Sequence, residues 1–326
     1  MQTYEPLLKL FSNQLADYSK GLSLRQPKEL YEPEAYILSL GGKRLRPLLA
    51  LIACDLFDKD PALALNSALA VELFHNFSLI HDDILDEAPL RRNQATVHHK
   101  WNTNIAILSG DAMLVKAFQA LSAYDASEYK QLSHLLQSTA IEVCEGQQMD
   151  MNFERDNVVG VDDYVHMITL KTAVLLGCSL KMGAMAAGAG TEDQDHLYAF
   201  GKNLGVAFQL LDDYLDAFAK DAGKFGKQPG GDILANKKTF LLLKCAEKAD
   251  ATTTAEIARL MQLKDPAEKV SAMLRIFSQL GVGDLCLAEA DAFTKKAIDC
   301  LEQVNASSKK KNALRQMALE LLNRQV

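Results

Sequence analysis

The sequence predicts an all-α protein built mainly of long helices. Apolar residues recur three and four positions apart through almost the whole chain, which is the period of an amphipathic helix. The 326 residues include only 18 glycines and 8 prolines, and no proline occurs between Pro89 and Pro229. Because glycine and proline are the residues that most often end helices, their low frequency favours long helices over a turn-rich β architecture.

The apolar period and the breaking residues together place the individual helices. Two clear helical stretches begin at Pro47 and Ser67, and breaks fall at Gly41-Gly42 and Pro89. Further helices are expected to start near Thr103, Ser127, Asp162, Glu192, Lys238 and Asp265. No break is followed by a change of composition, so we expect residues 1–326 to form a single domain.

Composition and charge exclude several classes of protein. The 35 basic and 42 acidic residues give a net charge of −7, which is not the basic footprint of a nucleic-acid-binding protein. The six cysteines lack CxxC spacing, and the N-terminus lacks the pattern of a secretory signal. The longest uninterrupted apolar runs, such as Leu48 to Cys54, are shorter than the roughly 18–20 residues that span a membrane. These features predict a cytoplasmic protein without a membrane span.

Two acidic motifs stand out because they repeat the same pattern 130 residues apart. Residues 81–86 read HDDILD and residues 211–216 read LDDYLD, each at the end of an apolar helical stretch. Residues four apart share one face of a helix, so Asp82 lies over Asp86 and Asp212 over Asp216, with Asp83 and Asp213 beside them. A single copy is typical of a solvated helix end. Two copies favour oxygen ligands for Mg²⁺, which prefers carboxylates, water and substrate phosphates.

Basic residues accompany both acidic motifs. The string GGKRLRP at 41–47 is a glycine turn that places Lys43, Arg44 and Arg46 at the start of a helix. Arg91 and Arg92 follow the first acidic motif, and Lys227, Lys237 and Lys238 follow the second. Arginine suits bidentate phosphate contacts and lysine suits point-charge contacts. Cations beside both acidic motifs, in an acidic protein, indicate anions that bind together with metal ions.

In this order, the motifs resemble those of the trans-isoprenyl diphosphate synthases, the polyprenyl synthetase family. The resemblance runs from GGKRLRP through HDDILDEAPLRR to LDDYLD and beyond. Short strings complete it: Gly110-Asp111, Gly146-Gln147 with Asp150, Lys171-Thr172, Phe208-Gln209, Gly226-Lys227, and Asp232 with Lys237 and Thr239. Each string alone is weakly specific, whereas the ordered set is highly specific.

The resemblance implies a fold, a reaction and a set of roles. It implies antiparallel helices around a deep central cavity, in a homodimer, and a Mg²⁺-dependent 1′-4 condensation of isopentenyl diphosphate with dimethylallyl, geranyl or farnesyl diphosphate. Three Mg²⁺ would be held by Asp82, Asp83, Asp86, Asp212, Asp213 and Asp216. The allylic diphosphate would be bound by Arg91, Lys171, Gln209, Lys227 and Lys237, and isopentenyl diphosphate by Lys43, Arg46, His75 and Arg92. Lys171, Thr172 and Gln209 would act at the reacting centre.

The sequence departs from the family at one loop. Members usually read RRGxPT after the first acidic motif, whereas this chain has Arg-Arg-Asn-Gln-Ala-Thr at 91–96. The missing glycine and proline leave the conformation of that loop open, while its charges remain.

The helix before Asp82 is expected to set the product length. Phe77 and Ser78 lie about 6–7.5 Å down that helix from Asp82, and Phe74 lies one turn deeper. An aromatic residue at position 77 resembles the short-chain synthases, so we expect geranylgeranyl or farnesyl diphosphate as product, with the twenty-carbon chain favoured. Phe74 and His75 could equally be ordinary core residues.

Three other functions compete with that of a synthase. A class I terpene cyclase would carry an Asn/Ser/Glu metal triad in place of the second DDxxD. A non-catalytic regulatory subunit would be expected to have lost acidic or basic residues of the site. A metal-dependent phosphohydrolase would need additional clustered histidines among the seven present.

Overall fold

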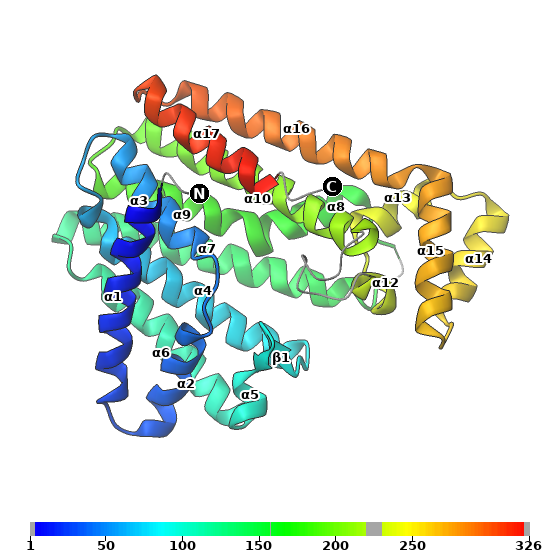
Figure 1. The fold of residues 1–326 in the computed structure, drawn as a ribbon, viewed down its shortest axis with the longest axis horizontal. Coiled ribbons are helices and arrows are strands. Elements are labelled where there is room, and N and C mark those ends of the chain that lie inside the picture. Colours follow the sequence, from blue (N-terminus) through cyan, green and yellow to red (C-terminus); the bar gives the residue numbers. More distant parts are fainter. Residues whose placement is uncertain (1–3, 157, 220–229, 323–326) are drawn as a thin grey trace. The chain divides into compact units, whose positions relative to one another are not determined.

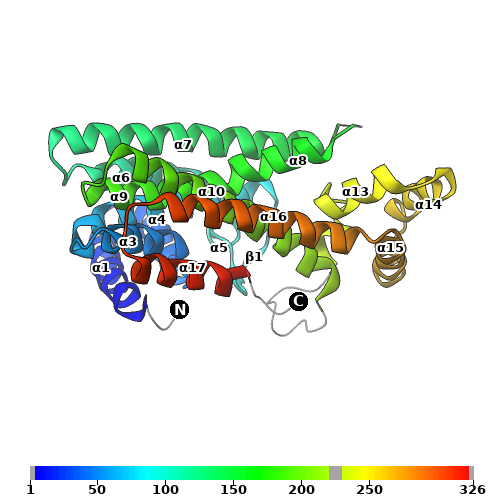
Figure 2. The same cartoon turned by 90° about the horizontal axis from the view of Figure 1, so that it is seen from above.

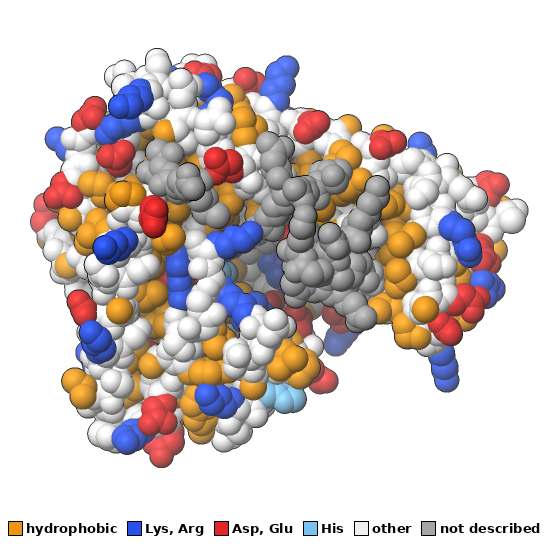
Figure 3. Space-filling view, viewed as in Figure 1, with side chains coloured by type: hydrophobic (Ala, Val, Ile, Leu, Met, Phe, Trp, Pro, Cys, Tyr) orange, Lys and Arg blue, Asp and Glu red, His pale blue; other side chains and the backbone are white. Residues whose placement is uncertain are grey.

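The computed structural model describes residues 4–156, 158–219 and 230–322 and is mostly helical, as predicted (Figure 1). The chain folds as two compact units. The first comprises Met1–Thr139, Leu175–Tyr198 and Gln303–Leu314, and the second comprises Ala140–Val174, Ala199–Glu302 and Arg315–Val326. Figure 3 shows basic and acidic side chains interspersed on the visible face.

The first unit contains the N-terminal helices. They are α1 (Glu5–Ser23), α2 (Lys28–Ser39), α3 (Leu45–Leu56), the 3₁₀ helix η2 (Pro61–Ala64), α4 (Leu65–Leu85), α5 (Val97–Lys100) and α6 (Thr103–Leu121). The short strands β1 (Leu90–Arg91) and β2 (Gln94–Ala95) form an antiparallel hairpin. In the two views of Figures 1 and 2, α4 packs along α6, and α1 lies beside α2 and α3.

Helix α4 is the central element of the first unit. Its residues from Ser67 to Phe74 are all buried, including the polar side chain of Glu72. Helix α6 can approach α4 closely because Gly110 has no side chain: a Cβ there would overlap the ring of His81. The side chain of Asn102 accepts a 2.9 Å hydrogen bond from the backbone N–H of Ile105 and so caps the start of α6.

The second unit contains α8 (Val161–Ile168), the π-helical turn η3 (Thr169–Ala173), α12 (Gly231–Leu234), α13 (Phe240–Lys248), α14 (Ala251–Met261) and α15 (Pro266–Leu280). Helix α15 packs against α12, α13 and α14. Figure 1 shows α15 in orange, with α13 and α14 in yellow. It begins at Pro266 after the capping Asp265 and ends at Leu280, and the φ of 64° at the C-capping Gly281 suits glycine. The core of this unit includes Phe240, Leu260 and Phe277.

Five helices have residues in the ranges of both units: α7 (Ala126–Phe153), α9 (Val174–Ala186), α10 (Thr191–Phe218), α16 (Val282–Gln303) and α17 (Ser308–Leu322). The helices expected near Thr103, Ser127, Asp162, Glu192 and Asp265 begin within one residue of those positions. Helix α13 begins two residues later than expected, at Phe240.

Two stretches are long and apolar enough to cross a membrane by length and composition alone. They are Pro61–Leu85 and Val161–Ala186, and 61% and 78% of their apolar windows are buried inside the protein. The bent pair Pro266–Gln279 and Val282–Gln303 also passes the test when taken as one span. The expectation of no membrane span was drawn from uninterrupted apolar runs, and these stretches did not stand out there because polar residues such as Glu72 interrupt them. Most residues of these two stretches are apolar because they are buried inside the protein.

Candidate active site

The first acidic motif lies at the C-terminal end of α4. The N–H of Asp86 donates to the carbonyl of Asp82 at 2.9 Å, so the two aspartates stand one helical turn apart as predicted. Asp83 is 1% exposed, and Nε of Arg91 donates to its two carboxylate oxygens at 2.8 and 2.9 Å. Arg91 Nη2 also lies 3.4 Å from Asp82 Oδ2. Burial raises the pKa of Asp83, and Arg91 opposes this shift. Asp83 thus anchors the arginine that follows the motif.

The glycine-rich string forms the turn between α2 and α3. Gly41 and Gly42 have φ of 78° and 121°, in the region that favours glycine. Arg44, with φ of 46°, turns its guanidinium inward to the carboxylate of Glu72 and the carbonyl of Leu38. Arg44 therefore fixes the turn, whereas Lys43 is exposed.

Arg46 and His75 form a half-buried pair in the first unit. Arg46 Nη1 lies 3.2 Å from His75 Nε2, and Arg46 Nε has no hydrogen-bond partner among the described residues. Burial lowers the pKa of Arg46 to about 10. Burial, followed by the charge of Arg46, lowers the pKa of His75 well below 6.5, so the imidazole is neutral and can accept a hydrogen bond from Arg46. The pair has the donors and the positive charge to bind an anion.

The loop after the first acidic motif is a tight hairpin. Its register pairs Leu90 with Ala95 and Arg91 with Gln94, which leaves Arg92 and Asn93 as a two-residue turn. Both have positive φ, 53° and 60°, as in a type I′ turn. Asparagine tolerates this conformation better than most residues, so Asn93 can take the place of the usual glycine. Arg92 donates to the carbonyl of Gly41.

The second acidic motif lies on α10. Asp213 is 4% exposed and accepts hydrogen bonds from the hydroxyl of Tyr164 and, at 3.3 Å, from Nε2 of Gln209. Burial raises the pKa of Asp213 to about 8. Asp216 accepts a 3.0 Å hydrogen bond from the N–H of Asp232. As in the first motif, the middle aspartate is buried and hydrogen-bonded, here to Tyr164, which the sequence did not single out, while Asp212 is half-buried.

Lys171 and Thr172 lie on the π-helical turn η3. Lys171 Nζ lies 2.5 Å from Asp150 Oδ2 on α7. One turn earlier on α7 is Gly146, where a Cβ would overlap the backbone of Lys171. Gly146 therefore lets α7 approach η3, and Asp150 orients the ammonium group. π-helical turns occur frequently at functional sites.

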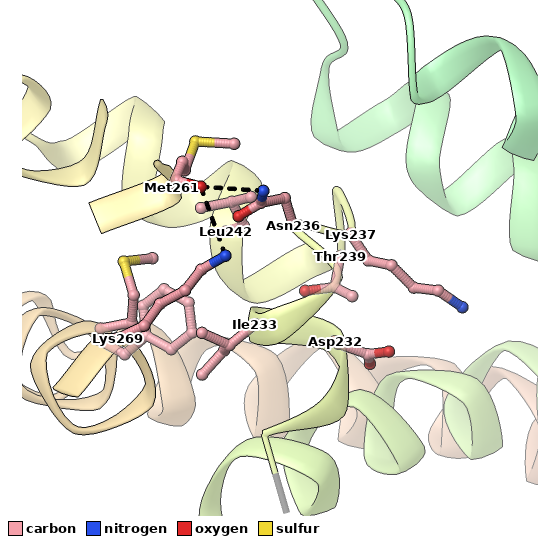
Figure 4. A pocket seen from close by; sticks show the side chains of 10 residues that line it. Asp232, Ile233, Asn236, Lys237, Thr239, Leu242, Met261 and Lys269 are labelled. Atoms are coloured by element: carbon pink, nitrogen blue, oxygen red, sulfur yellow. Dashed lines mark hydrogen bonds between the residues drawn. The ribbon is translucent and has the colours of Figure 1, made fainter. Parts of the chain in front are cut away.

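The basic residues after the second motif differ in their surroundings. Lys237 borders a small cavity of about 20 Å³, but its side chain points away from it (Figure 4). The cavity is closed by Lys269, whose Nζ donates to the carbonyl of Leu234 at 3.1 Å, and by Asn236, which donates to the carbonyl of Met261 at 3.2 Å. Lys227, predicted to bind the allylic diphosphate, lies outside the described residues.

The aromatic residues before Asp82 are in contact with one another. Phe74 is fully buried, and its ring centroid lies 5.6 Å from that of Phe77. Phe77 is half-buried and lies 4.8 Å from the ring of His81, edge to face. Ser78 is also half-buried and donates to the carbonyl of His75 at 2.8 Å. Phe74 is thus a core residue, and Phe77 and Ser78 retain exposed surface.

No group of three or more His, Cys, Asp or Glu side chains in the described part of the chain is arranged to hold a metal ion by itself. The donor chemistry nevertheless fits Mg²⁺, because each acidic motif offers carboxylates one turn apart and this ion keeps several waters or phosphate oxygens as ligands. The acidic motifs and the half-buried Arg46–His75 pair have the chemistry expected of a helical protein that binds diphosphates together with divalent metal ions.

Comparison with known proteins specifies this class further. Residues 27–279 match the polyprenyl synthetase family, and the chain belongs to it. It is 39% identical over 229 residues to geranylgeranyl diphosphate synthase of Methanosarcina mazei, covering 70% of each chain. It is 34% identical over 278 residues to geranylfarnesyl diphosphate synthase of Natronomonas pharaonis, covering 77% of this chain and 81% of the relative. The crystal structure of geranylgeranyl pyrophosphate synthetase from Pyrococcus horikoshii superposes with a TM-score of 0.91 at 32% identity, covering 99% and 98% of the two chains. The protein is a prenyltransferase with the all-α fold of this family, as predicted.

Proposed function

We propose that the protein condenses isopentenyl diphosphate with dimethylallyl, geranyl and farnesyl diphosphate in turn, and releases geranylgeranyl diphosphate. The observation that carries this proposal is the repeated arrangement of the two acidic motifs. In each, the first and last aspartates stand one turn apart on one face, and the middle aspartate is buried against its own partner. The twenty-carbon product is supported by Phe77 and by the names of several relatives.

The metal-binding groups in this proposal are the first and last aspartates of the two motifs, which are less buried than the middle ones. Asp82 and Asp86 on one helix, and Asp212 and Asp216 on the other, would each hold Mg²⁺ together with the allylic diphosphate. Bound Mg²⁺ supplies positive charge that stabilises the departing diphosphate. Asp83 and Asp213 support the site from the buried side of each motif. Asp83 orients Arg91, and Asp213 accepts a hydrogen bond from Tyr164.

The remaining side chains act on the two substrates. Lys43 and the Arg46–His75 pair bind the diphosphate of isopentenyl diphosphate, together with Arg92, which contacts the glycine turn at Gly41. Arg91, Lys171, Gln209, Lys227 and Lys237 bind the allylic diphosphate, and Thr172 presents its oxygen to the allylic carbon. The bond between this carbon and the diphosphate oxygen breaks, the double bond of isopentenyl diphosphate attacks the allylic carbon, and a proton passes to the released diphosphate. Dispersed positive charge on the enzyme stabilises the leaving group.

Product analysis tests the reaction. The purified protein is incubated with Mg²⁺, isopentenyl diphosphate and each allylic primer, and the products are separated by chain length. Longer prenyl diphosphates are expected. Hydrocarbons would indicate a cyclase, inorganic phosphate a hydrolase, and unchanged substrates a subunit without catalysis.

The metal ligands are tested by Asp82→Ala and Asp212→Ala. Each variant is expected to lose at least about 100- to 1000-fold in kcat, since groups that stabilise developing charge commonly contribute that much. Circular dichroism should show that the helical content is unchanged. Excess EDTA should abolish wild-type activity and added Mg²⁺ should restore it. Turnover near the wild-type rate in either variant would contradict the assignment.

Product length is tested at Phe77. The ring packs against Phe74 and His81 and cannot be compressed, so it is expected to stop the growing chain. Phe77→Ala should lengthen the products by at least one isoprene unit, as measured by chromatography of the dephosphorylated alcohols. Tyr129→Ala removes an exposed aromatic ring on α7 and serves as the control. An unchanged product distribution in Phe77→Ala would place the limit on length elsewhere.

A further inference from the structure

The hairpin that carries Arg91 and Arg92 needs support from outside its own two strands. Arg92 and Asn93 both have positive φ, which is strained for residues other than glycine, and each strand is only two residues long. Family members usually have proline at position 95, which would restrict the backbone there. This chain has Ala95, so some other contact must hold the second strand in place.

Tyr36 on α2 supplies such a contact. Its hydroxyl donates to the carbonyl of Ala95 at 2.7 Å. The ring is fixed in turn, because Trp101 packs against it edge to face with centroids 5.4 Å apart and Lys100 Nζ lies 3.7 Å from its centroid. Both the hydroxyl and the ring are therefore held in one position.

The same segment contacts the hairpin at a second point. Arg92 donates to the carbonyl of Gly41, five residues after Tyr36, and its guanidinium lies 2.6–2.7 Å from the position that a Cβ of Gly42 would occupy. Residues 36–42 thus hold the hairpin at the end of its second strand and at its turn. The turn they form leads directly to Lys43 and Arg46.

We propose that Tyr36 is a positioning residue for the binding of isopentenyl diphosphate: its hydroxyl holds the hairpin so that Arg92 stays against the glycine turn beside Lys43. This inference rests on the proposed function. Arg91 depends less on Tyr36, because Asp83 holds it through two hydrogen bonds. Loss of the Tyr36 hydroxyl should therefore affect isopentenyl diphosphate more than the allylic substrate.

Tyr36→Phe tests the proposal, since it removes the hydroxyl and keeps the ring. The expected result is a KM for isopentenyl diphosphate raised by about two- to tenfold, the range for loss of one hydrogen bond. The KM for the allylic diphosphate and the midpoint of thermal unfolding should change little. Tyr31→Phe is the matched control, because it removes a tyrosine hydroxyl from the same helix outside the contact with the hairpin. An unchanged KM, or equal increases for both substrates, would overturn the proposal.

A second substitution tests whether the loss of affinity comes from a loosened second strand of the hairpin. In Tyr36→Phe/Ala95→Pro the proline should restrict the strand and recover most of the lost affinity. Position 95 tolerates proline because the pair Arg91–Gln94 closes the turn, which makes Leu90–Ala95 a pair without ladder hydrogen bonds. Failure to recover the affinity in a folded double variant would overturn the proposal.

Hydrogen exchange separates this inference from the proposed function. In the free enzyme, the amides of Gln94 and Thr96 should exchange faster in Tyr36→Phe than in the wild type or in Tyr31→Phe. This measurement requires no substrate. If the wild type condensed no isopentenyl diphosphate while Tyr36→Phe still increased exchange at the hairpin, that result would contradict the proposed function but support the contact between Tyr36 and the hairpin. Unchanged exchange would overturn the role of Tyr36 whatever the activity.

Discussion

Burial lowers the pKa of both members of the Arg46–His75 pair, but it leaves one charged and the other neutral. Arg46 stays charged, because even a lowered pKa of about 10 is far above neutral pH. His75 stays neutral, because burial and the nearby arginines make the imidazolium unfavourable. Arg46 therefore supplies a positive charge. His75 supplies a neutral ring that can form a hydrogen bond without repelling the arginines. A charged histidine here would add a fifth cation to the neighbourhood of Arg44, Arg46, Arg91 and Arg92.

A pH dependence of stability follows from His75. Below pH 6.5 the unfolded chain takes up a proton at this residue and the folded protein does not, so stability is lost as the pH falls. Between pH 7.5 and 5.5 the wild type should lose about 1.4 kcal/mol more unfolding free energy than His75→Gln. Urea unfolding at both pH values measures this difference. Equal losses in the two proteins would show that His75 is protonated in the folded state.

Sequence reasoning found the residue types of the site but not their buried partners. The spacing of the aspartates and the glycine turn were visible because they are local patterns. The partner of Asp213 is Tyr164, 49 residues away, and the partner of Arg44 is Glu72, 28 residues away. The only local signal for Glu72 was a carboxylate inside an apolar helical stretch, and Tyr164 had none.

At the scale of elements, close approach between helices depends on particular glycines. Gly146 faces the backbone of Lys171 and Gly110 faces the ring of His81, so at both glycines of the family pattern an added Cβ would force a neighbour to move. The helix starts that the apolar period predicted all lie within two residues of observed starts, because this period depends on local sequence. The hairpin at 90–95 was not predicted, since its two-residue strands are too short to show alternation and it is held by α2 and the glycine turn.

Gly146→Ala should destabilise the protein by about 1–3 kcal/mol, since the added methyl group must displace backbone rather than a flexible side chain. Gly146→Ala should lower kcat while leaving the helical content nearly unchanged, because η3 carries Lys171 and Thr172. Gly21→Ala is the control: it is exposed, lies within α1 and has nothing within 4 Å, so it should stabilise by about 0.5–1 kcal/mol. Denaturant unfolding of both variants measures the contrast, and equal stability changes would contradict the close approach of α7 to η3.

At the scale of the whole molecule, the exposed apolar residues of α6 bear on assembly. Ile107, Leu108 and Val115 are 40%, 60% and 67% exposed, on a helix whose other face is buried against α4. Large apolar side chains gathered on one exposed helix face are typical of surfaces that bind another protein. Because the resemblance implies a homodimer, we propose a second copy of this chain as the partner of this face.

The oligomeric state tests this proposal. The wild type should show a mass of twice the 35.9 kDa of one chain in light scattering after size exclusion. Leu108→Glu/Val115→Glu should give monomers, because a dimer would have to bury two new charges from each chain without partners. The control is Leu24→Glu, which places the same charge at an isolated apolar residue that is 84% exposed, and it should remain dimeric. A monomeric wild type at micromolar concentration, or a double variant that stays dimeric, would rule out α6 as the contact between copies.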